Sequence, residues 1–232
     1  MKIMTFNTQH CKNFLEQRID FEIMAKAIRD CKADIVGLNE MRGKGESSEY
    51  EEQVQILSEL TGMKYYYFAP AIVFKNGGPY GNGILSKVPI LKAETILIPN
   101  PEIRKYDGYY ETRCILKAEL EGGITVLVTH FGLNPDEIEN AAKAVVSNIS
   151  SEKCILMGDF NITPDNPNLD LIRAKLVDTA EKFQSEKLSF PSDKPVIKID
   201  YIFVSPDFKI IDADIPNVVA SDHRPHTAIV DY

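Results

Sequence analysis

The chain has 232 residues, which is enough to bury one substantial hydrophobic core and falls within the range of one large domain. We therefore expect a single domain over residues 1–232. Hydrophobic residues make up 44% and charged residues 26% of the sequence, which excludes the compositional extremes of disordered, collagen-like and coiled-coil proteins. The formal net charge of -8 argues against a general binder of duplex DNA, although it leaves a local basic patch open.

The first third of the chain alternates predicted strands and helices. Residues 2–7 and 34–40 are apolar runs typical of strands, and they end in the polar side chains of Asn7 and of Asn39 with Glu40. Between these runs, apolar residues recur at helical spacing over residues 16–31. A second helix is predicted over residues 50–61, with Gly62 as its stop.

The middle of the chain consists of short runs rich in β-forming residues, punctuated by Gly, Pro and Asn. They predict an antiparallel section with strands at residues 65–68, 71–74, 83–86, 91–98, 112–119 and 124–129. A hairpin turn at residues 121–123 joins the last two strands, and residues 100–110 are predicted to form a surface loop. The final strand of this section delivers His130.

The last part of the chain returns to the alternating order. Pro135 at a first helical turn, with Asn134 as cap, predicts a third helix that leads to the apolar run 154–157 and the tetrapeptide Gly-Asp-Phe-Asn at 158–161. A short helix at 169–177, a loop to 195 and three strands at 197–204, 210–215 and 227–230 follow, with Asp200 interrupting the first of these strands. The order of elements is roughly two-fold, which predicts two stacked sheets with outer helices.

Isolated polar groups at strand ends are the candidate functional residues. Alternate residues of a strand share a face, so Asp159 and Asn161 are expected to point the same way while Phe160 points into the core. Asp200 lies among large apolar residues, where a carboxylate needs a partner such as a histidine. Taken singly, several of the other groups also fit structural roles, as turn residues, a satisfied core histidine or a surface carboxylate. The whole set is Asn7, Glu40, His130, Asp159, Asn161, Asp200, Asp222 and His223.

These groups together contain what hydrolysis of a phosphate ester requires. They offer oxygen ligands for a hard divalent ion, imidazoles to bind charge, a carboxylate to handle a proton and a carboxamide to orient a nucleophile. The oxygen-rich set favours Mg²⁺ or Mn²⁺ over Zn²⁺. The sequence has no Gly-x-Ser-x-Gly elbow, no Walker-type loop and no dinucleotide-binding Gly-x-Gly-x-x-Gly after a strand. The four cysteines form no Cys-x-x-Cys pair, so neither a zinc knuckle nor a dense disulfide framework is indicated.

The candidate residues lie in an ordered series of short motifs that covers nearly the whole chain. The series is Thr5-Phe6-Asn7, Gly37-Leu38-Asn39-Glu40, Thr129-His130-Phe131-Gly132, Gly158-Asp159-Phe160-Asn161, Ile199-Asp200-Tyr201-Ile202 and Ser221-Asp222-His223-Arg224-Pro225. This series resembles the endonuclease/exonuclease/phosphatase superfamily, as do the segment 81–87 and the strand around Arg113. The resemblance implies a deoxyribonuclease-I-like α/β fold, a four-layer α/β/β/α sandwich in which two stacked mixed sheets are flanked by helices.

The resemblance also implies roles for the metal and imidazole residues. Glu40 would be the principal ligand of Mg²⁺ or Mn²⁺, with Asn7 and Asp222 close to the ion. Asp200 would pair with His223, fixing the tautomer of the imidazole and keeping it charged against the phosphate. Such a pair would also provide the partner that a buried Asp200 needs.

The remaining roles implied by the resemblance concern the substrate. His130 would bind phosphate, and Asp159 would deprotonate the attacking water or protonate the leaving group. Asn161 would hold the phosphate or the nucleophile. Arg113 would contact substrate or form a structural ion pair, and Asn82 would contact substrate or serve a turn beside two glycines.

We therefore expect a divalent-metal-dependent phosphoester hydrolase that uses in-line attack of an activated water on a phosphodiester or phosphomonoester, with a small or lipid-like substrate. The sequence lacks tryptophan, a long basic insertion and an evident wedge loop, so a nucleic-acid partner is possible but is not supported by the sequence or by its acidic net charge. A DNA-repair or nonspecific nuclease is the alternative within enzymes, and a non-catalytic binding protein that keeps the fold is the alternative outside them. A calcineurin-type binuclear metallophosphatase would need more histidine motifs than four histidines provide.

Several properties depend on features that the sequence shows only in outline. Neither a signal-like apolar segment nor a stretch of membrane-spanning length is evident, so a cytoplasmic location is predicted unless a signal was trimmed. Substrate choice is expected to be made by loops at residues 42–48, 75–80, 100–110 and 182–195. Asn39, where many relatives have Gln, is expected to alter only local packing or hydrogen bonding. The substrate itself, the number of metal ions and the oligomeric state do not follow from the sequence.

Overall fold

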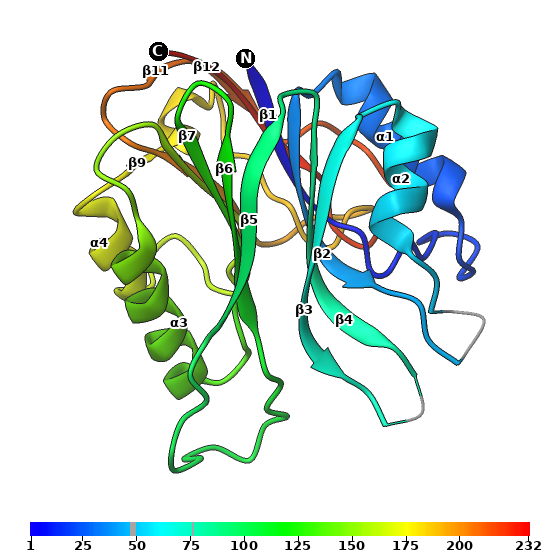
Figure 1. Cartoon of the computed structure of the whole chain (residues 1–232). Helices are drawn as coiled ribbons and strands as arrows, with labels where there is room; N and C mark the ends of the chain where they lie inside the picture. Colours follow the sequence, from blue (N-terminus) through cyan, green and yellow to red (C-terminus); the bar gives the residue numbers. More distant parts are fainter. Residues whose placement is uncertain (47–49, 76) are drawn as a thin grey trace.

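Two mixed six-stranded sheets lie face to face in the computed structural model, which describes residues 1–46, 50–75 and 77–232 (Figure 1). The first sheet has the order β11 (Lys209–Asp214), β12 (His226–Asp231), β1 (Lys2–Asn7), β2 (Ile35–Arg42), β4 (Pro79–Ser86) and β3 (Tyr65–Val73). The second has the order β5 (Ile90–Leu97), β6 (Cys114–Leu120), β7 (Ile124–His130), β8 (Cys154–Asp159), β10 (Asp200–Val204) and β9 (Val177–Asp178). Two of the predicted specificity loops, 42–48 and 75–80, extend into residues 47, 48 and 76, which lie outside the described residues.

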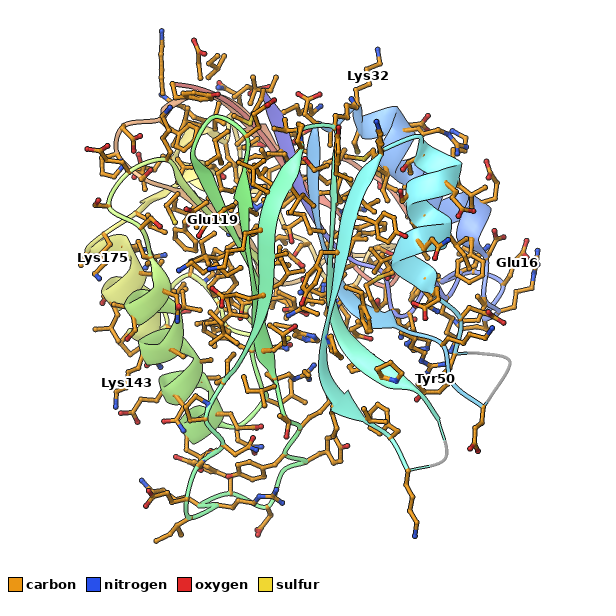
Figure 2. All side chains as sticks on the ribbon, viewed as in Figure 1. Glu16, Lys32, Tyr50, Glu119, Lys143 and Lys175 are labelled. Atoms are coloured by element: carbon orange, nitrogen blue, oxygen red, sulfur yellow. The ribbon has the colours of Figure 1, made fainter. Side chains whose placement is uncertain are left out.

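Helices cover the outer face of each sheet, so that the predicted four-layer α/β/β/α sandwich is confirmed (Figure 1). Helices α1 (Phe21–Cys31) and α2 (Gln53–Thr61) lie on the first sheet, and α3 (Pro135–Asn148) and α4 (Asn168–Arg173) on the second. A short 3₁₀ helix, η1, spans Thr179–Lys182. Apolar side chains fill the space between the sheets and beneath the helices, whereas Lys143 and Lys175 point outward (Figure 2). None of the helices in the described part of the chain has the length and apolarity needed to cross a membrane.

Local chemistry explains where the structure departs from the predicted elements. Helix α1 begins at Phe21 rather than near residue 16, because the Asp20 carboxylate accepts a hydrogen bond from the backbone N–H of Ile23 and caps the helix. The predicted strands at 65–68 and 71–74 form one strand, β3, with a register shift at Pro70. The predicted helix at 169–177 ends at Arg173 in α4, and strand β9 follows.

Two further expectations about strands were wrong. Asp200 does not interrupt a strand over residues 197–204; it is the first residue of β10. Asn82 lies inside β4 rather than in a turn, because the chain continues as a regular strand through Gly81 and Gly83. Predictions that are confirmed include the stop of α2 at Gly62, which adopts a left-handed conformation, and the start of α3 at Pro135.

Strand direction explains why polar residues from distant parts of the chain meet at one edge. In each sheet one pair of strands is parallel, β1 with β2 and β7 with β8, so the carboxyl ends of these strands lie side by side. Strand β10 runs antiparallel to β8, which places its first residue, Asp200, opposite the last residue of β8, Asp159. Strand β12 likewise begins beside the end of β1. The polar strand ends are therefore brought to the same side of the sandwich.

Gly158 allows the close approach of β7 and β8 at this edge. Its φ is +150°, and a Cβ atom at this position would lie 1.8 Å from the carbonyl oxygen of Thr129. No side chain other than hydrogen fits such a contact. The glycine of the Gly-Asp-Phe-Asn tetrapeptide therefore determines how closely Asp159 lies to His130 on the neighbouring strand, whose register pairs these two residues.

Lys198 is an unusual buried cation just before β10. Its ammonium group lies 3.2 Å from the centre of the Tyr201 ring and has no hydrogen-bond partner among the residues that the structure describes. Burial lowers the pKa of Lys198 to about 8, although the carboxylates of Asp178 and Asp200 act in the opposite direction. The charged amine therefore destabilises the folded state.

We expect Lys198→Met to raise the free energy of unfolding at pH 7 by about 2 kcal/mol, because the pKa shift corresponds to about 3 kcal/mol and the lost cation–π contact offsets about 1. The folded pKa lies below the ordinary value of 10.5, so the penalty is complete below pH 8 and disappears as the pH rises through 10.5. Urea denaturation at several pH values would measure this difference between wild type and variant. The exposed Lys92→Met is the control, with an expected change below about 0.5 kcal/mol. An equal effect of Lys198→Met at pH 7 and pH 11 would contradict the explanation.

Candidate active site

Asn7 lies at the centre of the polar edge, where it connects the two sheets. Its side-chain nitrogen donates to Glu40 Oε1 at 3.1 Å and to Asp159 Oδ2 at 3.0 Å. Its side-chain oxygen accepts a hydrogen bond from the backbone N–H of Gln9 at 3.0 Å. The structure therefore turns the amide nitrogen of Asn7, rather than its oxygen, toward the two carboxylates. The expected metal contact of Asn7 stays a prediction.

A β-bulge places the Glu40 carboxylate in the site. The pairing of β2 with β4 shifts register between Leu38 and Met41, and Glu40 between them has a φ of +61°. This left-handed conformation costs about 1–2 kcal/mol for a residue other than glycine, and bulges of this kind redirect side chains next to active sites. Burial acts to raise the pKa of Glu40, but the interaction with His10, the hydrogen bond from Asn7 and the positive charge of His223 outweigh it and hold the pKa below its usual range. The carboxylate is therefore ionised.

Asp159 lies deeper than Glu40 and is almost completely buried. Its Oδ1 accepts a hydrogen bond from the backbone N–H of Asn161, and its Oδ2 lies 3.5 Å from His130 Nε2 and 3.6 Å from His223 Nε2. Burial raises the pKa of Asp159 to about 7, with the charge of His223 acting against this and that of Asp200 with it. A carboxyl group whose pKa lies near neutrality can both accept and release a proton.

Asn161 reaches the site by a different route from that predicted. Strand β8 ends at Asp159, and Asn161 follows in a left-handed conformation with a φ of +52°. Its side-chain nitrogen nevertheless lies beside the same imidazole as Asp159. It donates to the carbonyl of Phe131 and lies 3.1 Å from His130 Nε2. Phe160 is fully buried, as predicted.

Arg113 determines the tautomer of His130. Its Nη1 lies 2.9 Å from His130 Nδ1, and a guanidinium group can only donate, so Nδ1 must be the acceptor. Burial and the neighbouring charge of Arg113 lower the pKa of His130 well below its usual value, so the ring is neutral and its proton is on Nε2. His130 therefore turns an N–H donor toward the Asn161 amide and toward Asp159 Oδ2, and donors of this kind suit the binding of an anion.

Arg113 also pairs with a carboxylate. The same Nη1 atom lies 2.8 Å from Glu111 Oε1. Arg113 was predicted to contact substrate or to form a structural ion pair, and the ion pair is present. The contact with His130 places the same guanidinium group beside the site. The expected contact of Arg113 with substrate stays a prediction.

Asp200 and His223 form the predicted pair. His223 Nδ1 lies 2.9 Å from Asp200 Oδ2, and Asp200 is fully buried. Burial acts to lower the pKa of His223, but the carboxylates of Asp200 and Asp159 outweigh it and raise the pKa well above its usual value. His223 is therefore a cation, in contrast to the neutral His130.

The ligand chemistry of the site suits a hard divalent cation. Glu40 and Asp222 supply carboxylate oxygens, and burial followed by the negative charge of Glu40 raises the pKa of Asp222. A cation between such like charges would relieve their repulsion. A second set, Asp159, Asp200 and His223, also offers ligand atoms within 4.8 Å of one another. In that set, His223 and Asp200 are already paired by a hydrogen bond, so we favour the oxygens of Glu40 and Asp222 for the cation.

Asn39 and Asn82 connect the sheets directly beneath the site. The side-chain nitrogen of Asn39 donates to Asn82 Oδ1 and to the carbonyl of Thr129, both at 2.8 Å, and its oxygen accepts from the backbone N–H of Asp159 at 3.0 Å. Asn82 in turn donates to the carbonyl of Cys114 at 2.9 Å. Asn82 is thus engaged in interior hydrogen bonds, and its expected contact with substrate stays a prediction.

We expect Asn39→Ala to lower the free energy of unfolding by about 3 kcal/mol, because the substitution leaves buried groups of Asp159, Thr129 and Asn82 without partners. Urea denaturation would measure the loss. Asn100→Ala removes a hydrogen bond between exposed side chains and serves as the control, with an expected loss below about 0.5 kcal/mol. Similar losses in both variants would contradict the role of the buried bonds.

Sequence reasoning missed three residues of the site. His10 Nδ1 lies 3.8 Å from Glu40 Oε2, and burial together with the charge of the same carboxylate raises the pKa of Tyr80 well above its usual value. Glu111 pairs with Arg113. His10 could have been identified from the sequence, because it follows the candidate residue Asn7 by three positions in a polar segment. Tyr80 and Glu111 could not, because their contacts depend on the conformations of a hairpin and a loop.

Comparison with known proteins identifies the family and the fold. The model of the endonuclease/exonuclease/phosphatase family matches residues 4–223. No curated protein matches the chain by sequence. An endonuclease/exonuclease/phosphatase from Beutenbergia cavernae has a similar structure, with 21% identity and a TM-score of 0.77 over 99% of this chain and 71% of that one.

Two other similar structures carry more specific names. A mannosyl-6-phosphatase from Bacteroides thetaiotaomicron is 16% identical, with a TM-score of 0.78 over the whole of both chains. TDP2 from D. rerio, in complex with a single-strand DNA product, is 17% identical, with a TM-score of 0.71 over 100% of this chain and 99% of that one. At these identities the structural similarity shows the shared fold.

Proposed function

Because the chain belongs to the endonuclease/exonuclease/phosphatase family, whose members are generally hydrolytic phosphoesterases and typically depend on a metal, we propose that it is a divalent-metal-dependent hydrolase of small or lipid-like phosphoesters. The observation that carries the proposal is the single network of contacts at the edge of the two sheets. Carboxylates, imidazoles and carboxamides from six separate segments lie within it: Asn7, Glu40, His130, Asp159, Asn161, Asp200 and His223.

The charges in this network are suited to a phosphoester. His223 is a cation, and the Nε2–H group of His130 and the Asn161 amide lie beside it around Asp159, so a phosphate group there would meet positive charge and hydrogen-bond donors. Asp159 contacts both imidazoles and has a pKa near neutrality, so it is suited to accept a proton from water as the water attacks phosphorus in line. Asp200 holds His223 in place and in its charged form.

Mg²⁺ or Mn²⁺ is the cofactor that the donor set fits best. Glu40 and Asp222 would hold the ion through oxygen, and Asn7 would fix the orientation of Glu40. A bound divalent ion supplies stabilisation of the negative charge that develops on phosphoryl oxygens. The Asn7 amide donates to both Glu40 and Asp159. It would therefore hold Glu40 in position for the metal and Asp159 in position for proton transfer.

The surroundings of the site support a small or lipid-like substrate. The loop between β5 and β6 extends beyond the strand ends, opposite the hairpin of β3 and β4 (Figure 1). It exposes the apolar side chains of Ile103, Tyr106 and Tyr109, which suit contact with an apolar group. The net charge of -8 disfavours a long polyanion. The mannosyl-6-phosphatase that shares the fold is named for a sugar phosphate, a substrate of this size class.

A substrate panel tests the proposal. Purified protein would be assayed with Mg²⁺ or Mn²⁺ on a chromogenic phosphodiester and monoester, a sugar phosphate, an inositol phosphate, sphingomyelin, and single- and double-stranded DNA. We expect turnover of a small or lipid phosphoester that a chelator abolishes and that the divalent ion restores. Turnover of DNA alone, with binding that weakens steeply as salt rises, would favour the nuclease alternative. Metal binding without turnover of any substrate would favour the non-catalytic alternative.

A further inference from the structure

His10 lies at the mouth of the site and has no part in the proposed proton transfers. Its Nδ1 lies 3.8 Å from Glu40 Oε2, on the side of the carboxylate opposite the oxygen that accepts from Asn7. The side chains of His10 and Glu40 each retain 22% of their exposure, so both can be reached from solvent. A third imidazole thus faces the carboxylate that is expected to hold the metal.

The backbone that presents His10 is strained. Gln9, His10 and Cys11 form a left-handed run with φ values of +46°, +48° and +62°. Glu40, which faces His10, is also left-handed, with a φ of +61°. Such conformations are unfavourable for residues other than glycine and persist where the surrounding structure enforces them, often at functional sites.

Contacts of the backbone, rather than of the imidazole, fix this run. Gln53 Nε2 donates to the carbonyl of His10 at 2.9 Å, and the carbonyl of Cys11 accepts from the backbone N–H of Asp20 at 2.8 Å. The Thr8 hydroxyl donates to the carbonyl of Asn39, the residue before Glu40. The segment that carries His10 is therefore fastened to the bulge that carries Glu40, and the imidazole is held beside the carboxylate.

The separation of the two side chains suits a shared cation better than a direct contact. A distance of 3.8 Å between Nδ1 and Oε2 exceeds the usual hydrogen-bond range of about 2.7–3.2 Å. Ligand bonds to Mn²⁺ or Zn²⁺ are about 2.0–2.2 Å long, so both atoms are within reach of one ion between them. Imidazole nitrogen is a good ligand for transition metals, whereas Mg²⁺ prefers oxygen.

We propose that His10 is a nitrogen ligand of the metal held by Glu40 and that it gives the site a preference for Mn²⁺ over Mg²⁺. This inference rests on the proposed metal site at Glu40. It adds a residue to that site and names the ion that the complete site selects.

Electron spin echo spectroscopy of Mn²⁺ bound to the protein tests the ligand directly, because a coordinated imidazole nitrogen modulates the echo of the manganese spin. Samples with natural-abundance and ¹⁵N-labelled histidine would identify the nitrogen as histidine. His10→Gly removes the imidazole and suits the left-handed backbone, so we expect this variant to fold with an unchanged or higher Tm. We expect it to lose the nitrogen modulation, which His130→Gln should retain.

Binding constants measured on the same proteins give a second readout that does not depend on catalysis. We expect His10→Gly and His10→Gln to raise the Kd of Mn²⁺ about 10-fold or more, and that of Mg²⁺ less than about 3-fold. Modulation that persists in His10→Gly, or an equal change in both Kd values, would overturn the inference while leaving the metal site intact. If wild type bound neither ion, and Glu40→Gln changed nothing, the inference and the proposed metal site would both fail.

Discussion

Asp159→Asn is expected to lower kcat by about 1,000-fold or more, a loss of about 4 kcal/mol of transition-state stabilisation, with little change in KM. The carboxamide has nearly the same shape as the carboxyl group but cannot take a proton from the attacking water. It can still accept the hydrogen bond from Asn7, which lies 3.0 Å from Asp159 Oδ2 in the wild type. Steady-state kinetics on the best substrate of the panel would measure the effect.

Folding and metal binding separate this effect from damage to the structure. Burial raises the pKa of Asp159, so a neutral side chain at this position should leave the Tm unchanged or higher. Asp165→Asn, in the exposed loop after the same strand, is the control and should retain wild-type kinetics. If Asp159→Asn kept its activity, Asp159 would not be the proton acceptor, and the proposed mechanism would be wrong.

Asp200→Asn is expected to lower kcat by about 100- to 10,000-fold, because the substitution removes the negative charge that keeps His223 protonated. Asp200 is fully buried and lies 2.9 Å from His223 Nδ1, so little solvent screens the interaction. A neutral His223 would give less stabilisation to the negative charge that develops on the phosphoryl group. The loss should appear in kcat for every phosphoester substrate.

Two measurements distinguish this role from a structural one. Asp212→Asn, an exposed substitution of the same kind in β11, should change neither kcat nor the Tm. If Asp200 acts through charge, His223→Gln should cost as much as Asp200→Asn, and the double variant should cost little more than either single variant. Additive losses in the double variant would show that the two residues act independently.

The order of the elements could largely be predicted from the sequence, because each strand and helix has a local periodic pattern of apolar residues. The apolar runs at residues 2–7, 154–157 and 227–230 are strands, and the capping signals at Asn134 and Gly62 mark real helix ends. The ends of helices were less well predicted where a capping side chain, rather than the apolar pattern, determines the first helical residue. The carboxylate of Asp20 sets the start of α1, although helical spacing begins earlier in the sequence.

Most residues of the candidate site were predicted from the sequence, but the contacts between them were not. Polar residues at the ends of apolar strands are visible in the sequence, and the family's motifs occur in order. The neutral state of His130 and the charged state of His223 could not be predicted from the sequence. They depend on the positions of Arg113 and Asp200, which only the folded chain brings next to these imidazoles. The orientation of the Asn7 amide and the approach of His10 to Glu40 likewise depend on neighbouring segments.

The fold class, the family and the set of polar residues at the strand ends could be predicted from the sequence, because they depend on local periodicity and on short motifs. The charge of each group, the donor in each hydrogen bond and the residues that support the site from the interior became known from the structure. Protonation and hydrogen bonding depend on burial and on the nearest charges, which are contributed by residues far away in the chain. Asn82 is the clearest case: two glycines beside it suggest a turn, but the paired sheets place it inside a strand, where it connects the layers beneath Asp159.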